Sequence, residues 1–108
     1  YYDESKLTNE KIETYRDLIL RENNRQSFID RAYIKAIDHS IRLKLIHTPT
    51  LILWGKQDAW IPVNNAKLFD ELLPNSEVAI MDKTGHIPME ERPMESLEIV
   101  KKFINKNK

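Results

Sequence analysis

The sequence predicts an α/β fold in which two parallel strands are flanked by helices. Three observations support this prediction. Two short apolar runs, residues 51–54 and 78–81, have the length and composition of buried strands. An amphipathic segment with helical spacing separates them, and another follows the second run. The order strand, helix, strand, helix is typical of right-handed crossovers within a parallel sheet.

The first third of the chain is predicted to form two surface helices. Thr8 is a suitable N-cap for a helix over about residues 9–21, whose apolar side chains share one face. A second helix, over about residues 25–38, has a stronger amphipathic pattern. Its apolar residues are Phe28, Ile29, Ala32, Tyr33, Ala36 and Ile37. The opposite faces are charged, so we expect both helices to cover another part of the protein.

Prolines mark the elements that follow. The run 51–54 is apolar on both faces, as expected of a strand that helices cover on both sides. Pro62 is expected in the first turn of a helix that runs to about residue 73, and Pro93 is expected to open the last helix. Only the lysine-rich tail, residues 105–108, is predicted to be disordered.

The composition narrows the classes of function. The chain has 108 residues, of which 17 are basic and 17 acidic, so its net charge is zero. Proteins that bind nucleic acid or a membrane surface need a basic excess, and we expect neither partner here. The absence of cysteine excludes disulfides and thiolate metal sites. No apolar run approaches the roughly 18 residues of a membrane span.

The start of the chain carries no information about location. The first methionine is Met81, so we expect that Tyr1 is not the native N-terminus. A shortened chain, a proteolytic product or an incomplete view of a longer chain would each explain this start. The localisation therefore stays unknown, with the cytoplasm as the default, because the lack of a leader has no meaning in this case.

Two polar side chains follow the two predicted strands. Asp58 comes shortly after Gly55, where the first strand ends, and His86 follows the second strand. The carboxyl ends of parallel strands meet at one edge of a sheet, where ligands bind in such folds. A turn-forming aspartate and an ordinary loop histidine would explain each residue taken alone. Together they predict a pair in which the carboxylate holds one ring nitrogen and the other acts as a general base. We expect Gly85 to adopt a backbone conformation that turns the ring toward this edge.

The residues around this pair resemble the C-terminal part of the α/β-hydrolase superfamily. The similarity lies in Pro49-Thr-Leu-Ile-Leu-Trp-Gly-Lys-Gln-Asp-Ala-Trp-Ile-Pro62 and Thr84-Gly-His-Ile-Pro-Met-Glu-Glu-Arg-Pro93, and it extends over about residues 42–105. In that family the acid follows the next-to-last strand and the histidine follows the last, an order that Asp58 and His86 match. The resemblance implies that residues 41–108 are the C-terminal part of the hydrolase core. Residues 1–40 resemble, more weakly, the last helices of the family's cap or lid.

The resemblance implies a hydrolase with a nucleophile–His–Asp triad that acts on a small-molecule ester or related acyl compound, as lipases and esterases do. Asp58 and His86 would be its catalytic acid and histidine, and no metal or organic cofactor would be needed. The nucleophile is missing. The family's Gly-x-Ser-x-Gly elbow cannot be present, because the chain's two glycines, Gly55 and Gly85, lie far apart. We therefore expect the chain to be a fragment that is inactive alone.

Other readings of the resemblance stay open. Haloalkane dehalogenases and epoxide hydrolases of the superfamily use the same histidine with an aspartate nucleophile. The same histidine also serves carbon–carbon hydrolases of ring-cleavage products, and the two motifs look most like lipase, esterase and carbon–carbon hydrolase members. Some relatives are receptors or scaffolds without catalysis. The presence of both Asp58 and His86 argues against a binding role of that kind. The sequence upstream of Tyr1 would separate these possibilities, because it would contain the nucleophile.

Several other residues are weaker candidates. Trp60 and Ile87 are candidates for lining the substrate pocket, although packing beneath the following helix would explain Trp60 equally well. His39 and His47 lack partners at metal-ligand spacing and are interpreted as surface residues. The charged segment 90–92 is expected to form the polar start of the last helix, where negative charge is favourable.

Two parallel strands with their helices are a poor independent unit. In the family, the strand at residues 51–54 is interior, so its open edge would expose backbone donors and acceptors. We therefore expect one of two states: the chain is part of a longer protein, or it forms a homodimer through this edge.

Overall fold

The computed structural model describes residues 1–35 and 37–108. The chain divides into two compact units. One unit comprises Tyr1–Lys6 and His39–Lys108, and the other comprises Leu7–Asp38. The sequence-based boundary between residues 40 and 41 falls close to the junction at residues 38 and 39. Residues 1–6 belong to the unit that contains the strands.

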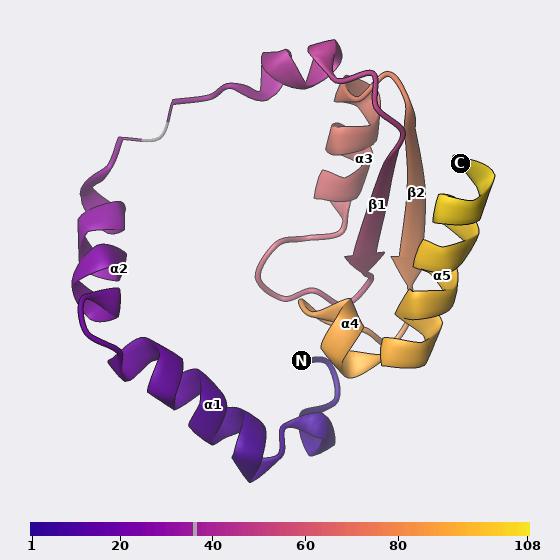
Figure 1. Ribbon diagram of the computed structural model, residues 1–108. Coiled ribbons are helices and arrows are strands. Elements are labelled where there is room, and N and C mark those ends of the chain that lie inside the picture. Colours follow the sequence, from indigo (N-terminus) through magenta and orange to yellow (C-terminus); the bar gives the residue numbers. More distant parts are fainter. Residues whose placement is uncertain (36) are drawn as a thin grey trace. The chain divides into compact units, whose positions relative to one another are not determined.

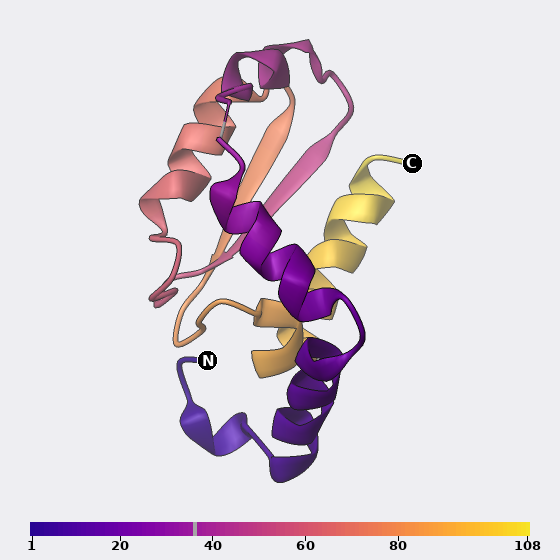
Figure 2. The same ribbon diagram turned by 90° about the vertical axis from the view of Figure 1, so that its left-hand side faces the viewer.

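The larger unit is built on two parallel strands, β1 (Thr50–Gly55) and β2 (Ser76–Met81). Their first residues pair with each other, and so do their last, so the two strands begin and end together. Helix α3 (Asn64–Leu72) connects them, and α5 (Pro93–Lys106) closes the unit. The two helices lie on opposite sides of the strand pair (Figures 1 and 2). The predicted α/β architecture of two parallel strands with flanking helices is confirmed.

A small apolar core holds α3 against the strands. Ile52 of β1, Ala66 of α3 and Leu73 are buried and pack together, with Leu43 and Trp54 against them. Leu43 comes from a 3₁₀ helix, η2 (Ser40–Leu45), that precedes β1. The indole Nε1 of Trp54 donates to the carbonyl of Ile61 at 3.0 Å. This bond attaches the loop after β1 to the strand itself.

The structure corrects three of the predicted boundaries. Pro62 lies before α3 and not in its first turn, because the helix begins at Asn64. A short helix that was not predicted, α4 (Pro88–Glu91), precedes α5, so the acidic residues of segment 90–92 do not start the last helix. Helix α5 continues to Lys106, whose ammonium group donates to Glu77 at 2.8 Å. That ion pair gives order to part of a tail whose charge alone suggested disorder.

The smaller unit consists of α1 (Asn9–Leu20) and α2 (Asn24–Tyr33). The Thr8 hydroxyl accepts from the main-chain N–H of Lys11, which confirms the predicted N-cap. Helix α2 ends earlier than predicted, and Ala36 of its predicted apolar stripe lies outside the described residues. A short 3₁₀ helix, η1 (Glu4–Lys6), precedes α1 in the chain.

Across the described parts of the chain, no helix combines the length and apolar character needed to cross a membrane.

The exposed edge of β1 leads to a first prediction. Within the described residues the sheet has two strands, so the edge of β1 that faces away from β2 has no strand partner. We expect the isolated 108-residue chain to associate through this edge, because its free N–H and C=O groups can pair with a second copy. Light scattering should give a mass above that of the monomer at micromolar concentration. A monomer that unfolds cooperatively at the same concentration would show that the two-strand unit is stable alone.

Candidate active site

The loops that follow the two strands are tied to each other by main-chain hydrogen bonds. Directly after β1, the N–H of Lys56 donates to the carbonyl of Met81 at 2.9 Å. The N–H of Gln57 then donates to the carbonyl of Thr84 at 2.9 Å, and the Gln57 side chain accepts from the N–H of Thr84 at 3.1 Å. These bonds continue the strand pairing into the loops. The residues that come next in each loop therefore lie close together.

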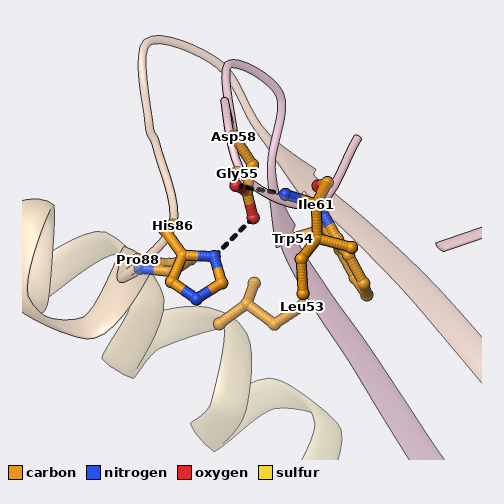
Figure 3. Close-up of a pocket in the computed structure, with 7 residues that line it drawn as sticks. All are labelled: Leu53, Trp54, Gly55, Asp58, Ile61, His86 and Pro88. Atoms are coloured by element: carbon orange, nitrogen blue, oxygen red, sulfur yellow. Dashed lines mark hydrogen bonds and ion pairs between the residues drawn. The ribbon is translucent and has the colours of Figure 1, made fainter. Parts of the chain in front are cut away.

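Asp58 and His86 meet at this edge of the sheet. The Asp58 Oδ2 atom lies 2.8 Å from Nδ1 of His86 (Figure 3). The other carboxylate oxygen accepts the main-chain N–H groups of Trp60 at 2.8 Å and Ile61 at 2.9 Å. The Asp58 side chain is only 4% exposed, whereas that of His86 is 37% exposed. The predicted contact is confirmed, and the second ring nitrogen, Nε2, faces away from Asp58 (Figure 3).

The environment of Asp58 favours its ionised form. Burial raises the pKa of this carboxyl group, but hydrogen bonds from Ile61, His86 and Trp60 outweigh burial, so the pKa lies below its ordinary value. An ionised carboxylate can only accept hydrogen bonds, so Nδ1 of His86 must carry the shared proton. In the neutral ring, Nε2 is then the acceptor. This tautomer is the one that a general base requires.

The lowered pKa of Asp58 predicts how the stability of the fold depends on pH. The folded-state pKa is below the unfolded value of about 3.9, so the stabilisation is fully present above about pH 5. It is lost as the pH falls through the folded-state pKa. Asp58→Asn should therefore flatten the acid dependence of the free energy of unfolding, by at most about 1.4 kcal/mol per pH unit. Urea denaturation across a pH series measures this slope. Asp17→Asn changes an exposed carboxylate and is the control; equal slopes in the two variants would contradict the prediction.

Both glycines permit a close approach of main chain to main chain. A Cβ atom on Gly55 would lie 1.9 Å from the carbonyl oxygen of Gly85 and 2.5 Å from that of Thr84. A Cβ atom on Gly85 would lie 2.7 Å from the main-chain nitrogen of Tyr2. The His86 ring is turned toward this edge as expected, but neither glycine has a positive φ, so Gly85 does not use the left-handed backbone region to do this. What these positions require is the absence of a side chain.

A cavity of about 180 Å³ opens beside the Asp58–His86 pair. Apolar side chains supply most of its lining, and the polar pair lies at one side (Figure 3). The lining residues are Leu53, Trp54, Gly55, Asp58, Ile61, His86 and Pro88. An apolar cavity with few polar groups is the usual form of a small-molecule site. The sequence did not single out Leu53, Ile61 or Pro88, because an apolar residue in a strand or after it has the same local pattern whether it lines a cavity or packs in a core.

Trp60 and Ile87, the two candidates for pocket lining, do not line this cavity. Trp60 is 80% exposed, so it does not pack beneath α3. Its ring lies against the ring of His86, with a centroid distance of 5.3 Å and an angle of 44° between the ring planes. Contact of either residue with a substrate stays a prediction.

Comparison with known proteins places this chain in a family. Residues 2–93 match the family described as alpha/beta hydrolase fold. The monoacylglycerol lipase ABHD6 of Mus musculus is 29% identical over 84 residues, which cover 72% of this chain and 25% of that protein. The chain thus spans about a quarter of the length of this relative.

Solved structures agree with this assignment. A structure described as a membrane phospholipase A, a bacterial virulence factor, is 34% identical, with a TM-score of 0.67 over 77% of this chain and 26% of that one. The meta-cleavage product hydrolase of Pseudomonas fluorescens IP01 has a TM-score of 0.82 over 99% of this chain and 42% of that one. At 21% identity, the second likeness shows the fold alone. The chain belongs to the α/β-hydrolase family.

Proposed function

We propose that this chain supplies the acid and the histidine of a nucleophile–His–Asp triad in a hydrolase that cleaves an ester or related acyl bond. The observation that carries the proposal is the 2.8 Å contact between Asp58 and Nδ1 of His86, with Nε2 turned away from the acid. The ionised, buried acid and the adjoining apolar cavity support it. Membership of the α/β-hydrolase family supports it as well.

Each member of the pair has a separate chemical role. Nε2 of His86 takes the proton of the nucleophile as the nucleophile attacks the acyl carbon, and later gives that proton to the leaving group. Asp58 holds the ring in the required tautomer and stabilises the imidazolium that forms. The apolar cavity beside His86 would receive a hydrocarbon part of the substrate. None of these steps calls for a metal or an organic cofactor.

The proposal places the nucleophile outside residues 1–108. A Gly-x-Ser-x-Gly elbow is absent from this sequence. Serine hydroxyl groups with described hydrogen bonds donate to partners other than His86: Ser5 to Asp3, Ser76 to Asp70 and Leu73, and Ser96 to Pro93. In this proposal residues 41–108 form the C-terminal part of the hydrolase core, and residues 1–40 form the end of the cap. The chain alone would be inactive.

The choice of an ester substrate is supported by the names of two relatives. One is a monoacylglycerol lipase and the other a phospholipase A, and both names describe enzymes that act on esters. Their sequence identities of 29% and 34% exceed the 21% of the meta-cleavage product hydrolase. A small acyl ester is therefore the first substrate to test.

Covalent labelling of the complete enzyme tests this function. A fluorophosphonate reacts with an activated serine, so we expect one label, mapped by mass spectrometry to a serine outside residues 1–108. His86→Ala should abolish labelling, and His47→Ala, which changes an exposed histidine, should not. The 108-residue chain alone should remain unlabelled and should hydrolyse a simple acyl ester no faster than buffer. A covalent adduct on an aspartate, or labelling that does not depend on His86, would contradict the proposal.

A further inference from the structure

Glu91 is a buried acidic residue that the proposed triad does not use. It lies at the end of α4, and only 2% of its surface is exposed. Its carboxylate accepts three main-chain N–H groups. Oε2 accepts from Tyr2 at 2.8 Å and from Gly85 at 2.9 Å, and Oε1 accepts from Ile87 at 3.2 Å. The donors on Gly85 and Ile87 belong to the residues on either side of His86.

Helix capping explains only part of this arrangement. Ile87 is the N-cap of α4, its carbonyl accepts from the N–H of Glu91 at 3.0 Å, and its own N–H donates to the Glu91 side chain. The first of these is the ordinary first hydrogen bond of a helix, and the second resembles the glutamate half of a capping box; both would form on an exposed helix as well. The bonds from Gly85 and Tyr2 lie outside the helix. They bring a charged group into a buried place, which a cap does not require.

The surroundings of Glu91 are arranged for a carboxylate. Burial raises the pKa of Glu91, but the N–H groups of Tyr2, Gly85 and Ile87 outweigh burial, so the pKa lies below its ordinary value. A Cβ atom on Gly85 would lie only 2.9 Å from Oε1, so glycine is needed for the carboxylate to come this close. The N-terminal segment covers the group, with the Lys6 ammonium 2.5 Å from the carbonyl oxygen of Glu91. The charged form of Glu91 is thus the form that the site holds.

We propose that Glu91 is the positioning residue of the loop that carries His86. By holding the peptide groups before and after His86, it keeps Nδ1 at hydrogen-bond distance from Asp58 and Nε2 turned toward the nucleophile. The inference rests on the proposed function, since it gives His86 the role of base. Glu91 acts through His86 and does not itself touch the substrate.

Glu91→Gln in the complete enzyme tests this role. Glutamine has the same shape, but one carboxylate oxygen becomes an NH₂ group that faces an N–H donor. The loop should shift, and because a misplacement of about 1 Å can cost about 10²-fold, we expect kcat to fall about 10²-fold. KM should stay within about twofold, because substrate binding does not use the bond to Asp58. The proton NMR signal of His86 Nδ1–H, which reports that bond, should broaden or disappear.

The matched control is Glu98→Gln. Glu98 is an exposed residue of α5 whose Oε1 atom lies 3.5 Å from Nζ of Lys101. The change removes the same charge and should leave kcat, KM and the NMR signal unchanged. Gly85→Ala is a second test that serves if Glu91→Gln does not fold. Its methyl group would lie 2.9 Å from Oε1 and 2.7 Å from the main-chain nitrogen of Tyr2, so it would push apart the carboxylate and its donors while the charge of Glu91 remains, and the same loss of kcat is expected.

His86→Ala, measured in parallel, separates the two proposals. If His86→Ala keeps the wild-type kcat, the proposed function fails, and the role of Glu91 fails with it. If His86→Ala is inactive while folded Glu91→Gln keeps the wild-type kcat, KM and NMR signal, the proposed function stands and the role of Glu91 is overturned. A lower yield of folded enzyme with an unchanged kcat per folded molecule would also overturn it.

Discussion

Replacement of His86 by alanine is expected to lower the kcat of the complete enzyme by about 10⁶-fold. The physical reason is the loss of the only group that the proposed mechanism uses to move the proton of the nucleophile. KM should change little, because the imidazole contributes to the transition state and not to the binding of the ground state. Steady-state kinetics on a simple acyl ester measures both parameters. The His86 side chain is partly exposed, so circular dichroism should show an intact fold.

Asp58→Asn extends this test to the other member of the pair. The asparagine amide would face Nδ1 with a donor or a weaker acceptor, and the ring would lose its preference for the required tautomer, at a cost of about 10⁴-fold in kcat. Because the two residues act as a unit, the double variant should be little worse than His86→Ala alone. His47→Ala is the control. A His86→Ala enzyme that keeps its kcat within tenfold of the wild type would contradict the proposed triad.

Of the two glycine-to-alanine changes, Gly55→Ala is expected to have the larger effect on stability. The new Cβ atom would lie 1.9 Å from the carbonyl oxygen of Gly85. The new Cβ atom would clash with main-chain atoms of the loop after β2, so no change of side-chain rotamer can relieve it. We expect a loss of about 3 kcal/mol in the free energy of unfolding, at the upper end of the usual cost of overpacking. Chemical denaturation measures this loss.

The same substitution should also impair catalysis. The loops after β1 and β2 would have to separate, which weakens the bonds between Gln57 and Thr84 and moves Asp58 away from His86. We expect kcat to fall about 10²-fold in the fraction that folds. Ala59→Gly changes one methyl group at an exposed position of the same loop and serves as the control. Wild-type stability in Gly55→Ala would show that the two loops are not in the direct contact described above.

The two acidic residues of the site differ in how far the sequence could predict them. Asp58 follows a recognisable strand and precedes a second strand with a histidine after it, so local patterns and their order were enough to propose the pair. Glu91 lies among charged residues before Pro93, a pattern typical of the solvated start of a helix. In the structure it is buried and accepts from the N–H of Tyr2, 89 positions away in the chain. No local pattern contains a contact of that kind.

By itself, the sequence determined the order of the strands and helices, the parallel pairing that this order favours, and the two side chains placed just beyond the strand ends. These features depend on the spacing of apolar residues and on short sequence motifs, which can be recognised from residues that are close together in the sequence. Only the tertiary structure decided that Gly55 and Gly85 serve close contact, that apolar residues such as Leu53 and Ile61 line a cavity, and that the Glu91 carboxylate accepts from the residues on either side of His86. The physical reason is that burial and hydrogen-bond partners depend on which distant segments of the chain meet. The sequence around a glutamate, a glycine or a leucine is the same whether or not such segments meet there.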